Sequence, residues 1–302
     1  MTECERIIKQ GILPESFFNE EVICDFLVTK ERKKIWAICL DLLLAFDRVC
    51  KANGLKYFLM HGALLGAIRH NGFIPWDDDI DVAMLRKDYD SLIEIASKEF
   101  STPYFFQTPY TDCGYFFSFP KLRNGNTTGI SSSFRFEQFN QGLFLDVFPL
   151  DNCLMEDAQI RYNRINELNL DNSNYMRKSS PDESDKIRFA KHSGRNPLDV
   201  IKEIENIQTM YKNKEDCLYV NNSACTVYAC KKFIYKKELF KESVNHKFEC
   251  FEIPIPVGWK EILEINYGDY MQMPPVEERG KWHDKVIMNA DVPYKNYVKD
   301  NL

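Results

Sequence analysis

The stretch FIPWDDDIDVAML, residues 73–85, places four carboxylates directly beside apolar residues that have the character of a protein core. The carboxylates belong to Asp77, Asp78, Asp79 and Asp81. Because like charges this close repel one another, we expect a cationic partner to compensate them.

The alternation of polar and apolar residues in this stretch predicts a strand over residues 79–84. Alternate side chains of a strand share a face, so Asp79 and Asp81 would point one way while Ile80 and Val82 enter the core. Asp77 has the same parity if the extended path begins early. Two carboxylates spaced in this way can chelate a hard cation such as Mg²⁺, with Mn²⁺ as an alternative.

Three other interpretations of the cluster compete with a metal site. A calcium-binding EF-hand loop fits at Asp77, Asp79 and Asp81 but fails at the glycine position, which is Val82, and at the last ligand, which is Asp88. A solvated acidic turn is common, but here an apolar strand follows at once. An N-cap for a helix at 87–98 would leave most of the cluster unexplained.

The segment before the cluster, FLMHGALLGAIRHNG at 58–72, is typical of a strand, a glycine turn and a short helix. We expect the helix to begin just after Gly62, where free backbone N–H groups could bind a phosphate. Arg69 ends this helix and could bind either the last carbonyl groups or a ligand.

A third carboxylate, Asp146, lies in the middle of the apolar stretch GLFLDVFPLD at 142–151. A buried aspartate is costly unless it is paired or bound to a metal. It could form a salt bridge with a lysine or arginine. It could instead converge with Asp79 and Asp81, so that three carboxylates hold one or two Mg²⁺ ions for displacement at phosphorus.

Composition excludes several classes of protein. The chain has 302 residues, a net charge of −6 and ten cysteines without a CxxC pair. The acidic balance argues against a nucleic-acid binder, and no apolar segment predicts a transmembrane helix. The first residues carry no export signal, so we expect reduced thiols and a cytoplasmic location.

Three stretches of the chain resemble the LicD family in order and spacing: MHGALLGAIRHNGFIPWDDDIDVAM at 60–84, GLFLDVFPLD at 142–151, and FEIPIPVGWKEILEINYGDYMQMPP at 251–275. This family is associated with phosphocholine transfer to bacterial surface polysaccharides and is related to fukutin and fukutin-related protein. The resemblance implies an α+β fold, with a nucleotidyltransferase-like mixed β-sheet flanked by helices and interrupted by a helical insertion. Residues 1–154 would form the catalytic core with its N-terminal helix, 155–217 the insertion, and 218–302 the part that completes the core.

The resemblance also implies roles for particular residues. His61, Gly62 and Ala63 match the glycine turn of the superfamily, although Ala63 replaces the usual glycine or small hydroxyl residue. Asp79, Asp81 and Asp146 match the catalytic, metal-binding carboxylates. We interpret further residues as contacts to the donor: Asp77, Arg69, Lys121, Arg123, Thr127 and His283.

The implied reaction uses a CDP-alcohol donor such as CDP-choline and moves the phospho-alcohol to a sugar hydroxyl of an oligosaccharide. The acceptor would be of the teichoic acid or lipopolysaccharide type and could be lipid-linked, with peripheral contact at the inner face of the membrane. Donors with ribitol or glycerol, nucleotidyl transfer from a nucleoside triphosphate, and a non-catalytic binding module stay as alternatives. Acceptor specificity is expected in the insertion, and the aromatic residues that would bind choline are not identified.

Overall fold

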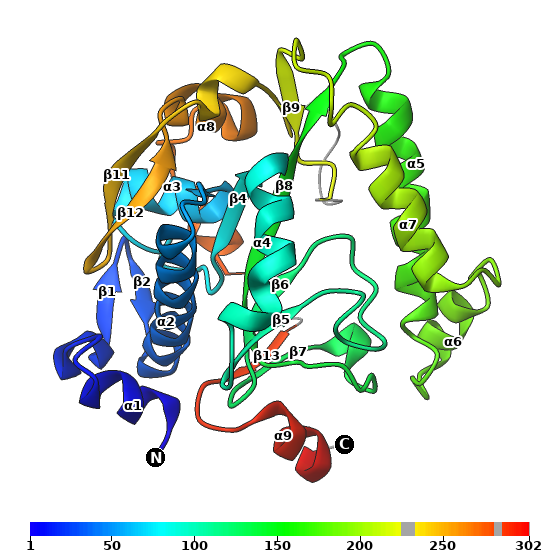
Figure 1. The fold of residues 1–302 in the computed structure, drawn as a ribbon. Coiled ribbons are helices and arrows are strands. Elements are labelled where there is room, and N and C mark those ends of the chain that lie inside the picture. Colours follow the sequence, from blue (N-terminus) through cyan, green and yellow to red (C-terminus); the bar gives the residue numbers. More distant parts are fainter. Residues whose placement is uncertain (225–232, 281–285, 302) are drawn as a thin grey trace.

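A mixed β-sheet with helices around it forms the centre of the molecule in the computed structural model, which describes residues 1–224, 233–280 and 286–301 (Figure 1). The main sheet has the order β10-β9-β8-β4-β3, and β6 joins β8 with β5 as its outer neighbour. This architecture confirms the α+β class and the mixed sheet flanked by helices. The strands are β3 (Phe58–Leu59), β4 (Asp81–Leu85), β5 (Tyr104–Gln107), β6 (Lys121–Asn124), β8 (Leu143–Cys153), β9 (Tyr219–Asn221) and β10 (Ile234–Lys236).

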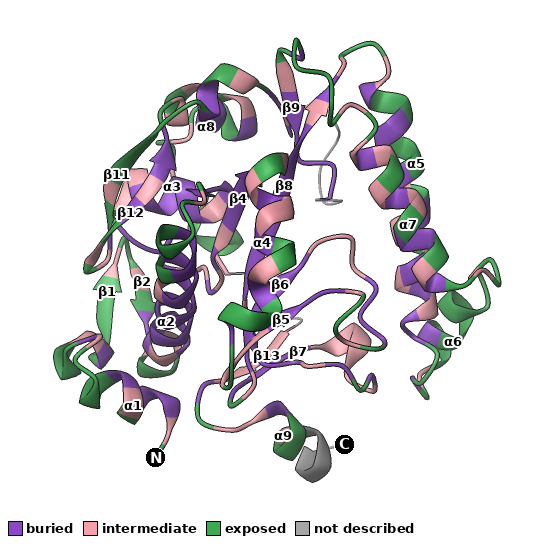
Figure 2. Ribbon diagram, in the orientation of Figure 1, coloured by how far each residue is buried: buried purple, intermediate pink, exposed green. Residues whose placement is uncertain are grey.

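The long strand β8 organises this sheet because it has neighbours along both edges. It pairs with β4 in parallel on one edge. On the other edge its first residues pair antiparallel with β6, and its last residues pair antiparallel with β9. Its side chains are almost all buried, as expected for a central strand covered on both faces (Figure 2).

Helices cover the sheet and fix the segments that lead into it. The longest helix, α2 (Lys30–Ala52), begins after Thr29, whose hydroxyl accepts a hydrogen bond from the Arg32 N–H. Most of α2 is buried, and it packs against β8 (Figure 2). The other helices near the sheet are α3 (His61–His70), α4 (Arg86–Glu99) and α8 (Trp259–Tyr267).

Three expected boundaries are wrong, each for a local reason. The helix α3 begins at His61 rather than after Gly62, because the Leu64 N–H already bonds the Met60 carbonyl. The strand β4 begins at Asp81 rather than at residue 79, since β3 ends opposite Val82 and leaves the earlier residues without a neighbour there.

The third wrong boundary is at residues 115–122, where the largely apolar stretch YFFSFPKL predicts a strand. Only its last residues join the sheet, where β6 begins at Lys121. Pro120 has no N–H to donate to a ladder. The aromatic side chains before it pack instead in a separate cluster that contains Tyr115, Phe116, Phe139 and Met176.

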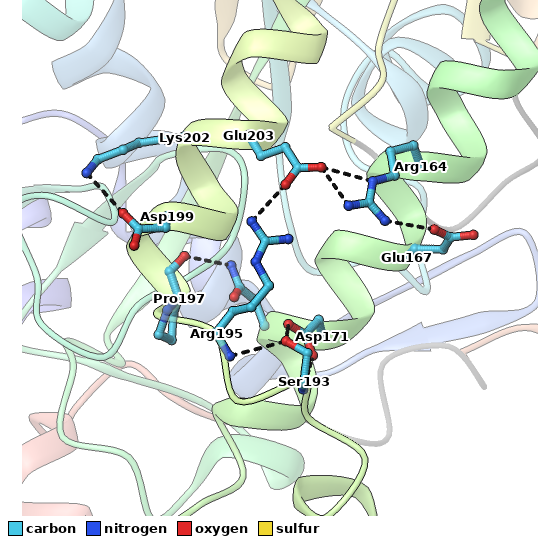
Figure 3. A network of polar contacts seen from close by, with 10 residues as sticks. Arg164, Glu167, Asp171, Ser193, Arg195, Pro197, Asp199, Lys202 and Glu203 are labelled. Atoms are coloured by element: carbon cyan, nitrogen blue, oxygen red, sulfur yellow. Dashed lines mark hydrogen bonds and ion pairs between the residues drawn. The ribbon is translucent and has the colours of Figure 1, made fainter.

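The segment between β8 and β9 is helical and consists of α5 (Ala158–Tyr175), α6 (Glu183–Phe189) and α7 (Pro197–Gln208). Helices α5 and α7 lie side by side and share their own apolar cluster, which includes Ile165 and Ile204. Figure 3 shows the polar contacts at their exposed edge, where the Glu203 carboxylate accepts hydrogen bonds from Arg164 and Arg195.

The remaining elements form small additions around this body. Three two-stranded sheets pair β1 with β2, β11 with β12, and β7 with β13. Their bounds and those of the terminal helices are α1 (Glu3–Lys9), β1 (Glu21–Ile23), β2 (Phe26–Val28), β7 (Thr128–Ser131), β11 (Ser243–Phe248), β12 (Phe251–Pro256), β13 (Val286–Asn289) and α9 (Tyr294–Asn301).

Candidate functional site

Two carboxylates and one ammonium group form a row across three neighbouring strands. Asp81 of β4 is the register partner of Asp146 of β8. Lys121 of β6 is the register partner of the same Asp146 on its other edge. Directly paired residues of neighbouring strands project to the same face of the sheet. The sheet therefore brings Asp81, Asp146 and Lys121 together side by side, and we call this set the carboxylate row.

Lys121 compensates Asp146. Its ammonium group forms an ion pair and a hydrogen bond with Asp146 Oδ1, and both side chains are about nine-tenths buried. Nζ also lies 3.8 Å from the ring centroid of Phe144 and 5.1 Å from that of Phe119. Burial lowers the pKa of Lys121, while the negative charges of Asp146 and Asp81 oppose that shift. The salt bridge that the sequence left open for Asp146 is thus present.

Helix α2 anchors the aspartate segment through its backbone. The Asp77 carbonyl accepts hydrogen bonds from Arg32 at 3.0 Å and from the indole N–H of Trp36 at 2.8 Å. The Asp78 carboxylate lies 3.5 Å from Arg32. Exposure alternates along the segment, since Asp77, Asp79 and Asp81 are partly exposed whereas Asp78, Ile80 and Val82 are buried. This alternation is the one expected if the first set shares a face.

The thiol of Cys39, on α2, lies near enough to several of these carboxylates for their charges to affect its pKa. Burial raises its pKa well above the usual value, and the charges of Asp79, Asp78, Asp77 and Asp146 raise it further. A single buried group therefore lies within electrostatic reach of both Asp79 and Asp146.

The chemistry of the carboxylate row suits a hard divalent cation. Carboxylate oxygens are the ligands that Mg²⁺ prefers, and Mg²⁺ is commonly held by one or two carboxylates together with substrate phosphates. Asp81 and Asp146 offer such a pair. Within residues 1–224, 233–280 and 286–301, no group of three or more His, Cys, Asp or Glu side chains is close enough to hold a metal ion.

His61 is a buried, neutral histidine at the start of α3. Its Nε2 lies 2.9 Å from the side-chain amide nitrogen of Asn222, and its ring packs edge-on against Phe148 and Phe233. Burial lowers its pKa to about 4. Its φ of +49° is uncommon for a residue with a side chain. Nothing in the local sequence around Asn222 indicates this partnership.

Because Gly62 has no side chain, another group can lie close to the backbone in the first turn of α3, and this group is the side chain of Asp77. A Cβ atom at this position would lie 2.6 Å from Asp77 Oδ2. A carboxylate at a helix N-terminus is favoured by the helix dipole. The Asp77 carboxylate therefore lies beside Gly62 in the first turn of α3. The side chain of Ala63 is buried.

Arg69 lies at the other end of α3, about 10 Å from Gly62 along the helix axis. Its guanidinium donates to the carbonyl groups of Tyr270 at 3.0 Å and Gln272 at 3.4 Å, and to the His70 ring at 2.9 Å. It therefore holds the segment after α8, and the structure does not bring it to the carboxylate row.

Arg123 and Thr127 are buried and use their polar atoms within the protein. The Arg123 guanidinium donates to the Gly142 carbonyl at 2.6 Å and to the Gln107 side chain. The Thr127 hydroxyl donates to the Asn124 carbonyl at 2.7 Å and accepts from the Leu143 N–H at 2.8 Å. Arg123 shares a strand face with Lys121, whereas Thr127 lies beyond the end of β6. His283 lies outside the described residues.

No helix in the part of the chain that the structure describes is long and apolar enough to cross a membrane.

Comparison with known proteins identifies the domain. Residues 54–192 match the family model described as LicD/FKTN/FKRP, nucleotidyltransferase domain. The lipopolysaccharide cholinephosphotransferase LicD of Haemophilus influenzae is 28% identical over 261 residues, which cover 82% of this chain and 93% of that protein. The ribitol 5-phosphate transferase FKRP of Homo sapiens is 39% identical over 51 residues, which cover 17% of this chain and 10% of that protein. Mannosyltransferase regulator 4 of Saccharomyces cerevisiae is 26% identical over 139 residues, which cover 44% of this chain and 11% of that protein.

The matched range contains α3, the aspartate segment and all three members of the carboxylate row. Residues 54–192 therefore form a nucleotidyltransferase domain of the LicD family.

Proposed function

We propose that this chain is a phosphotransferase that moves a phosphorylated alcohol from a CDP-alcohol donor to a hydroxyl group of a glycan. We propose phosphocholine, from CDP-choline, as the group transferred. The observation that carries the proposal is the in-register pair Asp81 and Asp146 within a LicD-family domain. The activities of two relatives, cholinephosphotransferase and ribitol 5-phosphate transferase, support a phospho-alcohol as the transferred group.

In this proposal Asp81 and Asp146 hold Mg²⁺, or Mn²⁺ in its place, and Asp79 is the third acidic member of the site. The bound ion supplies positive charge that neutralises the donor diphosphate. Lys121 offsets the charge of Asp146 at the buried end of the row. A carboxylate near the row accepts the proton of the acceptor hydroxyl, because transfer to phosphorus needs a base positioned on the nucleophile.

We also propose that the donor and the transfer are cytoplasmic, with an acceptor that can be lipid-linked at the inner face of the membrane. Among the described residues, Cys4, Cys39, Cys50 and Cys217 are buried free thiols, which is typical of a reducing compartment.

The test is a leaving-group assay on the full chain. The protein is incubated with Mg²⁺ and CDP-choline, CDP-ribitol or CDP-glycerol, with and without a bacterial glycan acceptor, and CMP is measured by chromatography. We expect CMP release, greatest with CDP-choline. Absence of CMP from all three donors contradicts the proposal.

Nucleotidyl transfer is the second candidate, because the matched family model describes a nucleotidyltransferase domain. The same assay with nucleoside triphosphates separates the two reactions: pyrophosphate release without CMP release would favour the second candidate.

A further inference from the structure

A pocket of about 420 Å³ lies between the aromatic segment 116–119 and helix α5. Its volume is within the range of small-molecule sites, about 300–1,000 Å³. Phe117 and Phe119 form part of one wall, and α5 forms the opposite one. The pocket therefore lies between the catalytic sheet and the helical segment.

Helix α5 presents a polar stripe to this pocket. The α5 residues that line the pocket are Asn166, Asn169, Leu170 and Ser173. Their spacing of three, four and seven residues from the first places them on one side of a helix. The apolar residues Ile165 and Leu168 belong to the other side, which packs against α7.

Several polar atoms at this pocket are buried and have no hydrogen-bond partner in the described part of the protein. They are Asn166 Oδ1, Asn169 Nδ2 and Ser118 Oγ. Buried polar atoms are almost always paired, because an unmade hydrogen bond costs about 1–3 kcal/mol. A carbonyl oxygen that accepts, an amide nitrogen that donates and a hydroxyl that does either are complementary to a ligand rich in hydroxyl groups.

The described lining of this pocket contains no charged side chain. The neighbouring pocket of about 520 Å³ differs, since Arg86, Asp90, Glu205 and Lys212 are among its lining residues. A nucleoside diphosphate needs cationic partners, so the neutral pocket does not suit the donor. Aromatic rings with amide and hydroxyl groups suit a neutral, polyhydroxylated ligand.

Phe119 connects this pocket to the carboxylate row. Its ring centroid lies 5.1 Å from Lys121 Nζ and 4.6 Å from the ring centroid of Phe148. The hydroxyl of Tyr115 donates to the Phe119 carbonyl at 2.7 Å and fixes the backbone there. A ligand in the pocket would thus be separated from the Lys121–Asp146 pair by one aromatic ring.

We propose that the pocket between segment 116–119 and α5 binds a neutral sugar ring of the acceptor glycan. The inference rests on the proposed function for its biological meaning, but the binding itself can be measured without the donor.

Saturation-transfer difference NMR on the full chain tests it. The probes are the methyl β-glycosides of glucose, galactose and N-acetylglucosamine, with methyl β-glucuronide as a charged counterpart. We expect signal from at least one neutral glycoside and none from the glucuronide. Asn166→Ala and Asn169→Ala should each weaken that binding about three- to tenfold, the loss of one hydrogen bond.

Asn163→Ala is the matched control, because Asn163 lies on the same helix but on its exposed side, where it accepts a hydrogen bond from Gln159. It should leave sugar binding unchanged. Asn169→Leu tests whether the effect is on sugar binding or on folding. Leucine removes a buried, unpaired amide, so the variant should keep or raise the melting temperature while it loses sugar binding.

Binding by none of the three neutral glycosides, or equal weakening by Asn163→Ala, overturns the inference. CMP release is measured on the same samples, so the two proposals fail separately. CMP release without sugar binding rejects only the pocket, and sugar binding without CMP release rejects only the reaction.

Discussion

The carboxylate row and the α5 pocket are both polar sites inside one small domain, but they balance polarity in opposite ways. In the row, Asp146 has its opposite charge, Lys121, on the neighbouring strand. In the pocket, neutral groups such as Asn166 Oδ1 and Asn169 Nδ2 have no partner among the described residues. Burying a charge without a partner costs far more than burying a neutral amide, which fits an opposite charge beside Asp146 in the row and neutral unpaired groups in the pocket.

The difference predicts how each region responds to substitution. Loss of a carboxylate from the row should alter the chemistry, and loss of Lys121 should lower the stability of the fold, because its charge compensates Asp146. Changes in the pocket should alter recognition alone.

The largest effect is expected from Asp81→Asn. Loss of one carboxylate from the proposed metal pair should lower CMP release about 10³-fold, while the near-identical shape of asparagine preserves the fold. The measurement is the steady-state rate with CDP-choline at saturating Mg²⁺. Glu94→Gln, at an exposed position of α4, is the control and should keep the full rate. A rate for Asp81→Asn within threefold of the unchanged chain would remove the row from the catalytic site.

Lys121→Met tests the internal compensation. Removal of one partner from a buried ion pair leaves an uncompensated charge, so the free energy of unfolding should fall by about 3 kcal/mol. Urea titration at pH 7 measures it. Added Mg²⁺ should recover part of the loss if Asp146 can bind the ion.

Lys212→Met is its matched control. Lys212 pairs with Asp90 at 2.6 Å, but the two side chains are 49% and 29% exposed. A pair this open contributes about 0–1 kcal/mol. Equal losses of unfolding free energy in the two variants would show that burial does not determine how much an ion pair stabilises the fold.

The two carboxylates of the row are the part of the site that could be predicted from the sequence. Alternation at Asp79, Ile80 and Asp81 indicated a strand with its acids on one face, and the lone Asp146 in an apolar run indicated a second strand. The strands were correct because a period of two is a strong local signal. The first residue of the strand expected over 79–84 was wrong, because β4 begins at Asp81, where its pairing with β8 begins.

Partners set by tertiary packing could not be predicted in this way. The salt bridge of Asp146 was one open alternative, but only the register of β6 against β8 selects Lys121. Asn222, which bonds His61, lies 161 residues away in sequence and carries no local signal. The α5 stripe was missed for another reason, because asparagines spaced along a helix resemble an ordinary solvated face.

His61 supplies a prediction of intermediate size. Its pKa is about 4 in the folded protein, against an ordinary value of 6.5, because burial disfavours the charged ring. The unfolded chain therefore binds more protons between these values. The stabilisation is complete above pH 6.5 and is lost as the pH falls toward 4, by about 2 kcal/mol at pH 5.

Urea titrations of the unchanged chain and of His61→Gln at pH 7 and pH 5 measure this loss. The pKa of His70 is also lowered, to about 4, so the difference between the two chains isolates His61. Glutamine does not titrate here, so its variant should lose less stability on acidification. Equal losses in both chains would contradict a buried, neutral His61.

The smallest effect is expected at Glu203 of α7, which holds Arg164 and Arg195 in the network of Figure 3. Both arginines lower the pKa of Glu203, but all three side chains are at least one-third exposed. Solvent screens such pairs, so Glu203→Gln should lower the free energy of unfolding by less than about 1 kcal/mol, and salt should erase the difference. Urea titrations at low and high salt measure it. A loss as large as that of Lys121→Met, unaffected by salt, would mean that the helical segment depends on charge as strongly as the carboxylate row does.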